Sequence, residues 1–279
     1  MLEDIWGVAA ATLNWLWNLS NSNFFTALVG AFAGAYGAQA IVERAGRKKR
    51  LLEEIRNTNA AIVVACSITN TFCALKSQHV KGLKENLDAQ RKELEIFKQA
   101  RKQGAVAPEE AFYFQADFQS LPVVQVPIDV LRNLLFEKLS LVGRPLSIVA
   151  VLSQTIDSVI GAIERRNRII DECKRRAPIP INELVPLYFG LPNKDGHVDM
   201  TYSETVSAIY SHTDDCIFFS HLLGEDLEKH GKRLAKVYGS KAPRIEKTAF
   251  TNAERKALLP DPSLYSDWMK MPDASVDPG

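Results

Sequence analysis

The chain has 279 residues, 46% of them hydrophobic, and a formal net charge of +1 at pH 7. This length accommodates a membrane segment together with one soluble domain of ordinary size. The near-neutral charge excludes a general attraction to nucleic acid, so an anion-binding site would have to be a local patch.

Residues 1–23 are uncharged after Asp4 and rich in tryptophan. As a helix, this segment would be too short to span a bilayer comfortably, and it lacks the basic start of a signal peptide, so we expect it to be retained. It is compatible with an amphipathic helix at the outer interface, with a re-entrant segment that plugs or lines an opening on an oligomer axis, or with a short second span. The side chains of a plug would share one side of the helix: Trp6, Leu13 and Trp17.

Residues 24–42 form an uncharged stretch, FFTALVGAFAGAYGAQAIV, that is long enough to cross a bilayer as a helix. Only Glu3 and Asp4 are charged before it, whereas a cluster of basic residues follows closely, between positions 44 and 50. By the positive-inside rule, the basic end stays in the cytosol. We therefore predict one transmembrane helix, with the N-terminus outside and the chain from residue 43 onward in the cytosol.

The predicted span sorts its side chains by size. At about 100° per residue, small residues gather on one flank, and Phe32 and Tyr36 fall on the opposite side. Small residues let helix backbones approach closely in a bilayer, which predicts self-association, although glycine and alanine are common in membrane helices generally. The predicted oligomer or pore face comprises Thr26, Gly30, Ala33, Gly34, Gly37 and Gln39.

Helical periodicity continues from Leu51 to about Lys102, and Gly82 is interpreted as a kink because the periodicity resumes after it. Residues 104–127 contain prolines and an aromatic cluster, which predicts a connection wrapped on the core. Apolar residues repeat every seven positions before this connection, which favours a coiled-coil-like seam: Cys66, Cys73, Val80, Leu87 and Leu94.

The rest of the chain is also predicted to be helical, with no strand alternation. Helices are expected over residues 128–141, 145–176 and 201–239, the last opened by a capping box of Thr201 and Glu204. Turn signals predict an irregular segment over residues 181–198. We therefore predict an all-α protein with an antiparallel helical bundle over residues 43–240. A proline-rich arm over residues 241–279 is expected to hold a short helix near 252–259 and a disordered end.

No motif of nucleotide binding, hydrolysis or paired cysteines occurs in the sequence, so we predict no catalytic residue, no cofactor and no metal. His212 and Cys216 share a helix face, but His221 and His230 are out of register with them, which disfavours a convergent metal site. The cysteines are expected to be reduced thiols in the cytosol. An enzyme is therefore not predicted.

A basic run ends the helix predicted over residues 145–176. Repeated by symmetry in an oligomer, such a run would concentrate positive charge where guanidinium groups can hold a nucleotide or oligonucleotide phosphate. Alternatively, these cations complement the helix dipole, pair with the interleaved Glu164, Asp171 and Glu172, or face anionic lipid. The predicted ligand-binding residues are Arg165, Arg166, Arg168, Lys174, Arg175 and Arg176.

The layout of residues 1–50, followed by a helical cytosolic part, resembles the single-span membrane effectors of bacterial anti-phage defence systems, the Hailong-type effectors among them. The resemblance is architectural and transfers no site residue. It implies a location in the bacterial inner membrane and a nucleotide-synthesising or sensing partner that controls a membrane-disrupting protein.

Two main functions compete on this basis. The first is a homo-oligomeric effector of four or more copies that conducts ions or disrupts the membrane under the control of its cytosolic domain, which a nucleotide, an oligonucleotide or a signalling protein would address. The alternative is a membrane-tethered scaffold or signalling module that binds a partner protein without forming a pore. A membrane-anchored enzyme would gain support if mutation of His212 or Asp215 abolished activity without altering assembly.

Overall fold

The computed structural model describes residues 12, 15, 17, 23–107, 109–248 and 256–273. It divides the chain into two compact units, Met1–Glu53 and Glu54–Gly279, of which we call the second the helical domain. Across the described residues every regular element is a helix and no strand occurs, apart from one isolated bridge between Pro192 and Val198. The predicted all-α class is therefore confirmed.

The first unit contains the start of helix α2, which spans Asn23–Leu75. From residue 27 to residue 45 every side chain is exposed except that of the half-buried Ala40. Phe32 and Tyr36 are 70% and 79% exposed. A Cβ atom added at Gly30, Gly34 or Gly37 would meet no other atom within 4 Å. Among the residues described in this unit, the apolar helix therefore has no packing partner.

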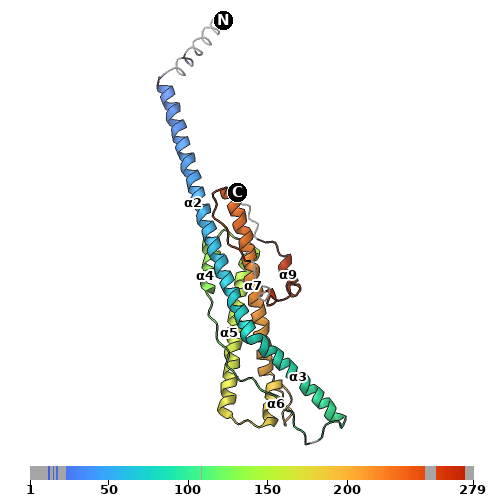
Figure 1. The fold of residues 1–279 in the computed structure, drawn as a ribbon. Coiled ribbons are helices and arrows are strands. Elements are labelled where there is room, and N and C mark those ends of the chain that lie inside the picture. Colours follow the sequence, from blue (N-terminus) through green and yellow to red (C-terminus); the bar gives the residue numbers. More distant parts are fainter. Residues whose placement is uncertain are drawn as a thin grey trace, which may run out of the picture. The chain divides into compact units, whose positions relative to one another are not determined.

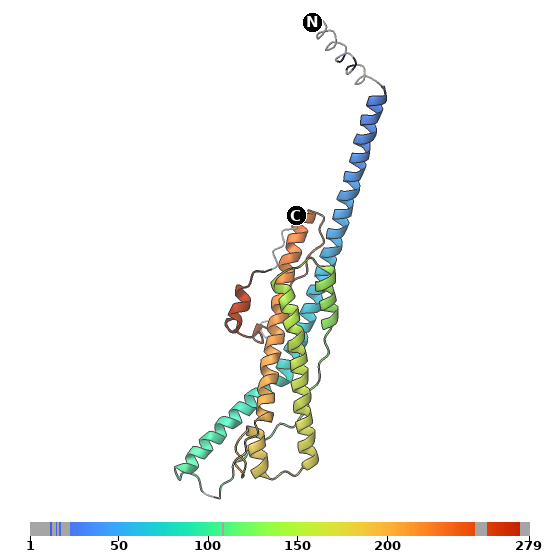
Figure 2. The same ribbon diagram turned by 180° about the vertical axis from the view of Figure 1, so that it is seen from behind.

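The helical domain is built around α5 (Arg144–Arg176) and α7 (Thr201–Tyr238), which run side by side in opposite directions (Figure 1, Figure 2). Their facing sides form the core, where Leu152 and Ile209 are fully buried. The part of α2 in this domain also packs on α7, through a hydrogen bond that the Thr69 hydroxyl donates to Ser220 Oγ at 2.8 Å. Both hydroxyls are buried, and Ser220 in turn donates to the Cys216 carbonyl oxygen of its own helix at 2.6 Å, so its hydroxyl has partners away from water.

The seven-residue apolar repeat lies in the core. Cys73, Val80, Leu87 and Leu94 are at most 4% exposed, and Cys66 is half-buried. The sequence predicts a kink at Gly82. The structure has an irregularity a few residues earlier, where Lys76–Val80 form a π-helical segment between α2 and α3 (Lys81–Lys102). In Figure 1 helix α3 leaves the direction of the end of α2 at this segment.

The irregular segment predicted over residues 181–198 is in part a helix, α6 (Ile181–Phe189). Pro180 stands at its N-cap and Gly190, with a φ of 66°, at its C-cap. Tyr188 and Phe189 are buried and meet the wrapped connection at Phe114, with ring centroids 5.4 Å and 5.1 Å away. The prediction failed here because the turn signals that begin at Gly190 were extended back over a helix of only nine residues that contains Pro186.

Three smaller differences separate the predicted helices from those in the structure. The helix predicted over 128–141 consists of α4 (Ile128–Asn133) and a π-helical segment, Leu134–Lys138. The predicted capping box of Thr201 and Glu204 is wrong, because the side chain of Asp199 accepts the Thr201 N–H at 2.9 Å instead. In the C-terminal arm, residues 252–255 of the predicted short helix lie outside the described residues. The arm does contain a short 3₁₀-helix and α9, which we did not predict: Pro262–Tyr265 and Ser266–Lys270.

Candidate functional site

The basic run lies in the last turns of α5, and one of its members differs from the others in its exposure to solvent. Arg166 is completely buried. The remaining five are exposed to solvent: Arg165, Arg168, Lys174, Arg175 and Arg176.

Arg166 fastens the wrapped connection to the helices. Its guanidinium donates hydrogen bonds to the carbonyl oxygens of Gln119 at 2.7 Å and Asp117 at 3.1 Å, and lies 3.4 Å from the Tyr202 hydroxyl of α7. Burial raises the pKa of Tyr202 well above its usual value, so its hydroxyl remains a neutral hydrogen-bonding group. Arg166 is therefore not accessible to a ligand from solvent, and its predicted ligand-binding role is corrected to a structural one.

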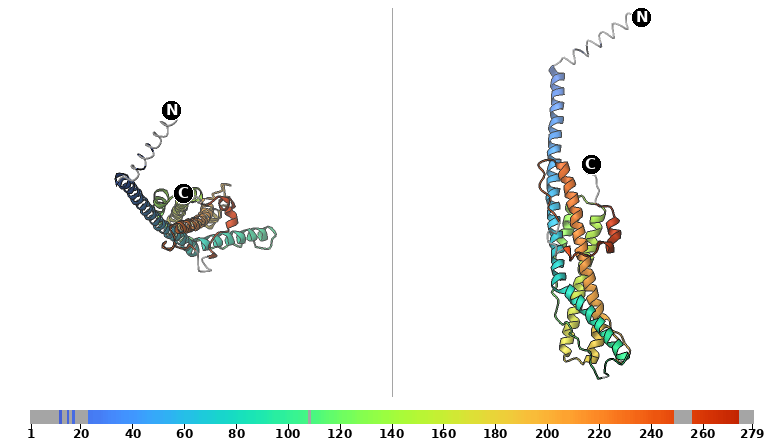
Figure 3. Two further views of the ribbon diagram at one scale, coloured as in Figure 1. Left: turned by 90° about the horizontal axis from the view of Figure 1, so that it is seen from above. Right: turned by 45° about the vertical axis from the view of Figure 1, so that its right-hand side comes forward.

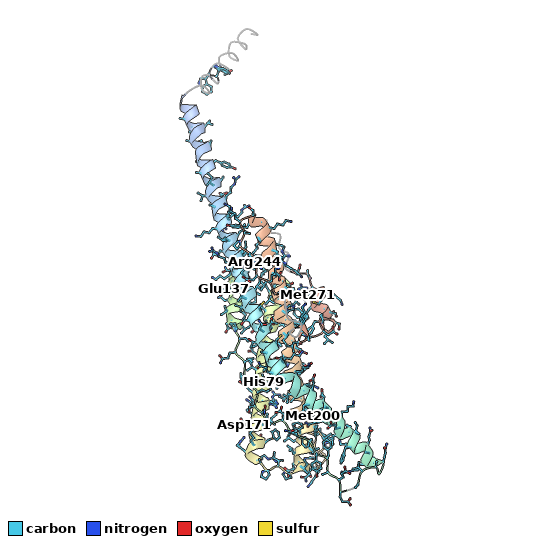
Figure 4. All side chains as sticks on the ribbon, in the orientation of Figure 1. His79, Glu137, Asp171, Met200, Arg244 and Met271 are labelled. Atoms are coloured by element: carbon cyan, nitrogen blue, oxygen red, sulfur yellow. The ribbon has the colours of Figure 1, made fainter. Side chains whose placement is uncertain are left out.

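Two of the exposed basic residues have local partners. Arg176 forms an ion pair with Glu183 of α6 at 3.1 Å, and Arg175 Nε lies 3.4 Å from the Asp171 carbonyl oxygen one turn earlier. Figure 4 shows Asp171 and Met200 near the same end of the domain, where α5 ends and α7 begins. Arg176 thus pairs with Glu183 rather than with Glu164, Asp171 or Glu172, and the role of the exposed members of the basic run stays a prediction.

A pocket of about 380 Å³ adjoins the end of the basic run. Its lining includes the apolar Leu187 and Leu191, and Arg176 is the member of the basic run that lines it. Two permanent cations, Arg176 and Lys194, stand in the lining against three carboxylates: Glu183, Asp195 and Asp199. The balance of charge therefore does not favour a phosphate ligand in this pocket.

The histidines and cysteines do not converge. Across the described residues no group of three or more potential metal ligands occurs. His212 Nδ1 lies 3.8 Å from Asp215, whereas His230 faces Glu54 at 3.3 Å. Cys216 is fully buried, and this burial raises the pKa of its thiol far above the usual range, which makes it inert at neutral pH.

The predicted pore face and plug are described only in part. Gly30, Ala33, Gly34, Gly37 and Gln39 are all exposed, and the Gln39 amide donates to Glu43 at 2.9 Å. Thr26 lies within α2, but its side chain is outside the described set. Trp17 is helical and 68% exposed, whereas Trp6 and Leu13 lie outside the described residues. The plug is thus neither confirmed nor contradicted.

Two helices among the described residues are long and apolar enough to cross a membrane by length and composition: the helix Ala27–Lys102 and α5. In α5 the apolar side chains pack inside the helical domain, with Ile148, Leu152 and Val159 fully buried. In the first helix, too, half of the most apolar 18-residue stretch is buried, so that stretch lies later in the helix than residues 27–42, which are exposed apart from the half-buried Ala40. Comparison of the chain with protein-family models, with curated proteins and with solved structures gave no match.

Proposed function

We propose that the chain is a homo-oligomeric membrane effector, whose single spans associate to conduct ions or disrupt the membrane under the control of the helical domain. The observation that carries this proposal is the exposed apolar surface of residues 27–42. Keeping a large apolar side chain such as Phe32 in water rather than in an apolar environment costs about 1.5–3 kcal/mol of free energy, and a bilayer removes that cost. The basic residues after the span support a cytosolic helical domain.

Association of copies follows from the geometry of the span. One helix cannot enclose a pore, so a conducting path needs about four or more copies. Gly30, Gly34 and Gly37 have open space where a Cβ would stand, so another helix can approach the backbone there. The architectural resemblance assigns such an effector to bacterial defence in the inner membrane, where a signalling partner or an anionic nucleotide or oligonucleotide would address the helical domain. The exposed members of the basic run are its candidate contacts.

The decisive experiment is the mass of the complex in detergent, combined with substitutions on the two sides of the span. We expect an oligomer of four or more copies by light scattering. Replacing Gly30 and Gly34 with isoleucine should dissociate it and abolish depolarisation of cells on overexpression. Because a Cβ added at either position meets no atom within 4 Å outside the helix's own nearby backbone, such a loss would report contact between copies. Phe32→Leu, on the opposite side, is the matched control and should change neither property.

A monomeric wild-type chain would refute the proposal. If the protein is an oligomer but keeps its cellular effect when the span is exchanged for an unrelated one, the membrane-tethered scaffold is the correct alternative. The two results are distinguishable, because the first concerns mass and the second concerns activity.

A further inference from the structure

The C-terminal arm has two parts that differ in how they meet the helical domain. We call residues 241–248 the anchor and residues 256–273 the strap. We propose that the strap is releasable: it covers Phe218 and Phe219 of α7 in the resting protein and detaches without unfolding the helical domain. This proposal does not depend on the membrane function proposed above.

The strap covers α7 mainly through aromatic side chains. The Tyr265 ring stacks on Phe218, with centroids 3.8 Å apart, and the Trp268 ring meets Phe219 edge-on at 5.0 Å. The Tyr265 hydroxyl donates to Asp215 Oδ1 at 2.7 Å. Figure 3 shows α9 lying beside α7. Phe218 and Phe219 are only 7% and 5% exposed in this arrangement, so release of the strap would expose an apolar surface.

Two buried cations bind backbone carbonyl groups of the strap. Lys76 of the π-helical segment donates to the Leu258 carbonyl oxygen at 3.0 Å. Arg144, at the start of α5, donates through Nη1 to the Met271 carbonyl oxygen at 2.9 Å. Met271 is labelled in Figure 4 beside α9. These contacts hold both ends of the strap.

Both cations keep a carboxylate partner without the strap. Arg144 donates through Nε and Nη2 to the two oxygens of Asp226, at 2.8 Å and 2.5 Å. Lys76 lies 2.5 Å from Asp214. A buried charge that loses its partner is very costly, but departure of the strap would leave both ion pairs intact. The carbonyl groups of the strap would exchange a protein donor for water.

The strap also buries little of itself. Pro260 is its one buried residue, and Leu264 is 77% exposed. Its apolar contacts with the core are made by four half-buried side chains, Leu258, Leu259, Tyr265 and Trp268. Their loss would expose Phe218 and Phe219 but leave the fully buried residues between α5 and α7, such as Leu152 and Ile209, in place.

The anchor is built differently, because α7 has glycines where it passes. A Cβ at Gly224 would stand 2.7 Å from the Thr248 side chain, and one at Gly231 would stand 3.0 Å from Ile245. Asn59 of α2 binds the anchor backbone on both sides of Ile245, accepting from the Glu246 N–H at 3.1 Å and donating to the Arg244 carbonyl oxygen at 2.8 Å. Thr248 is only 7% exposed. The anchor is thus part of the domain, whereas the strap lies on it.

The test follows urea unfolding of the full chain in detergent micelles by two probes. Trp268 is the one tryptophan outside residues 1–23, so replacing Trp6, Trp15 and Trp17 with phenylalanine makes fluorescence report on the strap alone. Circular dichroism reports on the helices. A releasable strap predicts that the fluorescence transition precedes the loss of helix by about 1 M urea or more.

Variants sharpen this test. Tyr265→Phe removes only the bond to Asp215 and should move the fluorescence transition to lower urea, without shifting the circular dichroism transition. Leu264→Ser is the matched control and should move neither transition. Gly224→Ala forces the anchor away and should move the circular dichroism transition. Coincident transitions in the parent protein, or a Tyr265→Phe variant that shifts both transitions equally, would overturn the proposal.

Discussion

Residues 27–42 and helix α5 are both apolar and helical, but their surroundings differ. In α5 the apolar side chains are spaced along one side and are buried against other helices, with Leu152 and Ile163 fully inaccessible. In residues 27–42 bulky side chains such as Val29 and Phe32 are exposed, and no charged residue interrupts any side of the helix. Hydropathy therefore identifies both segments, whereas the distribution of charge around each helix indicates which solvent it meets.

The largest effects are expected when a charged residue is placed in each of these two helices. Leu152→Asp buries an unpaired carboxylate in the core and should destabilise the helical domain by about 4 kcal/mol or more, measured by urea unfolding followed by circular dichroism. Val29→Asp should leave that unfolding unchanged and instead lower the membrane-bound fraction in a flotation assay, since a charge costs up to about 2.5–3.5 kcal/mol in a span, most at its centre. A Val29→Asp variant whose domain unfolds early would show that residues 27–42 pack within a soluble fold.

The start of α5 gives the next largest effect. Asp226→Ala would leave Arg144, which is only 5% exposed, without its carboxylate partner. We expect a loss of about 3–5 kcal/mol in the free energy of unfolding, measured in urea. Asp267→Ala is the control, because that carboxylate is 94% exposed and its pair with Lys270 should contribute about 0–1 kcal/mol. Equal effects of the two substitutions would mean that the Arg144–Asp226 pair is not buried in solution.

The smallest effect concerns the dependence of stability on pH. A hydrogen bond with His230 lowers the pKa of Glu54 below its usual value, and Glu54 also accepts the Ser140 N–H. Because the folded pKa is the lower one, Glu54 stabilises the domain above the unfolded pKa, and this contribution disappears as the pH falls through the folded pKa. Glu54→Gln should therefore cost about 1 kcal/mol at pH 7 and flatten the acid side of the stability curve. The exposed neighbour Glu53, changed to glutamine, should leave the curve as it is.

The sequence predicted the long elements well, because helices of many turns repeat their apolar spacing often enough to be recognised. Helix α7 ends before Gly239, and α5 has Pro145 in its first turn, as expected. Helix α6 escaped because it has only nine residues and contains Pro186. The start of α7 was misassigned by one position, since Thr201 and Glu204 form a familiar capping pattern, whereas the N-cap is Met200 and the Thr201 N–H is bound by Asp199 before it.

The candidate site was less predictable than the fold. Local spacing placed Arg166 among neighbouring cations, but its partners are carbonyl groups at residues 117 and 119, far away in the sequence. Every residue has a backbone carbonyl group, so the residue types in the sequence do not show which carbonyl accepts a hydrogen bond from a given side chain. The contacts of Arg144 and Lys76 with the strap were missed for the same reason. The apolar and uncharged character of residues 27–42, by contrast, could be recognised in the sequence because it depends on composition alone.

The π-helical segment Lys76–Val80 has a consequence for how this chain tolerates changes in length. Such a segment is equivalent to one extra residue in an otherwise regular helix. Deleting a single residue from it, for example the exposed Ser77, would restore the regular winding and leave the later side chains of α3 on the sides they now face. Deleting one residue from the regular part of α3, for example the exposed Glu85, would instead turn every later side chain by about 100°, so that Leu87 and Leu94 would face away from the positions they now fill. A codon lost inside the π-helical segment would therefore disturb the interior of the protein less than one lost a few residues later.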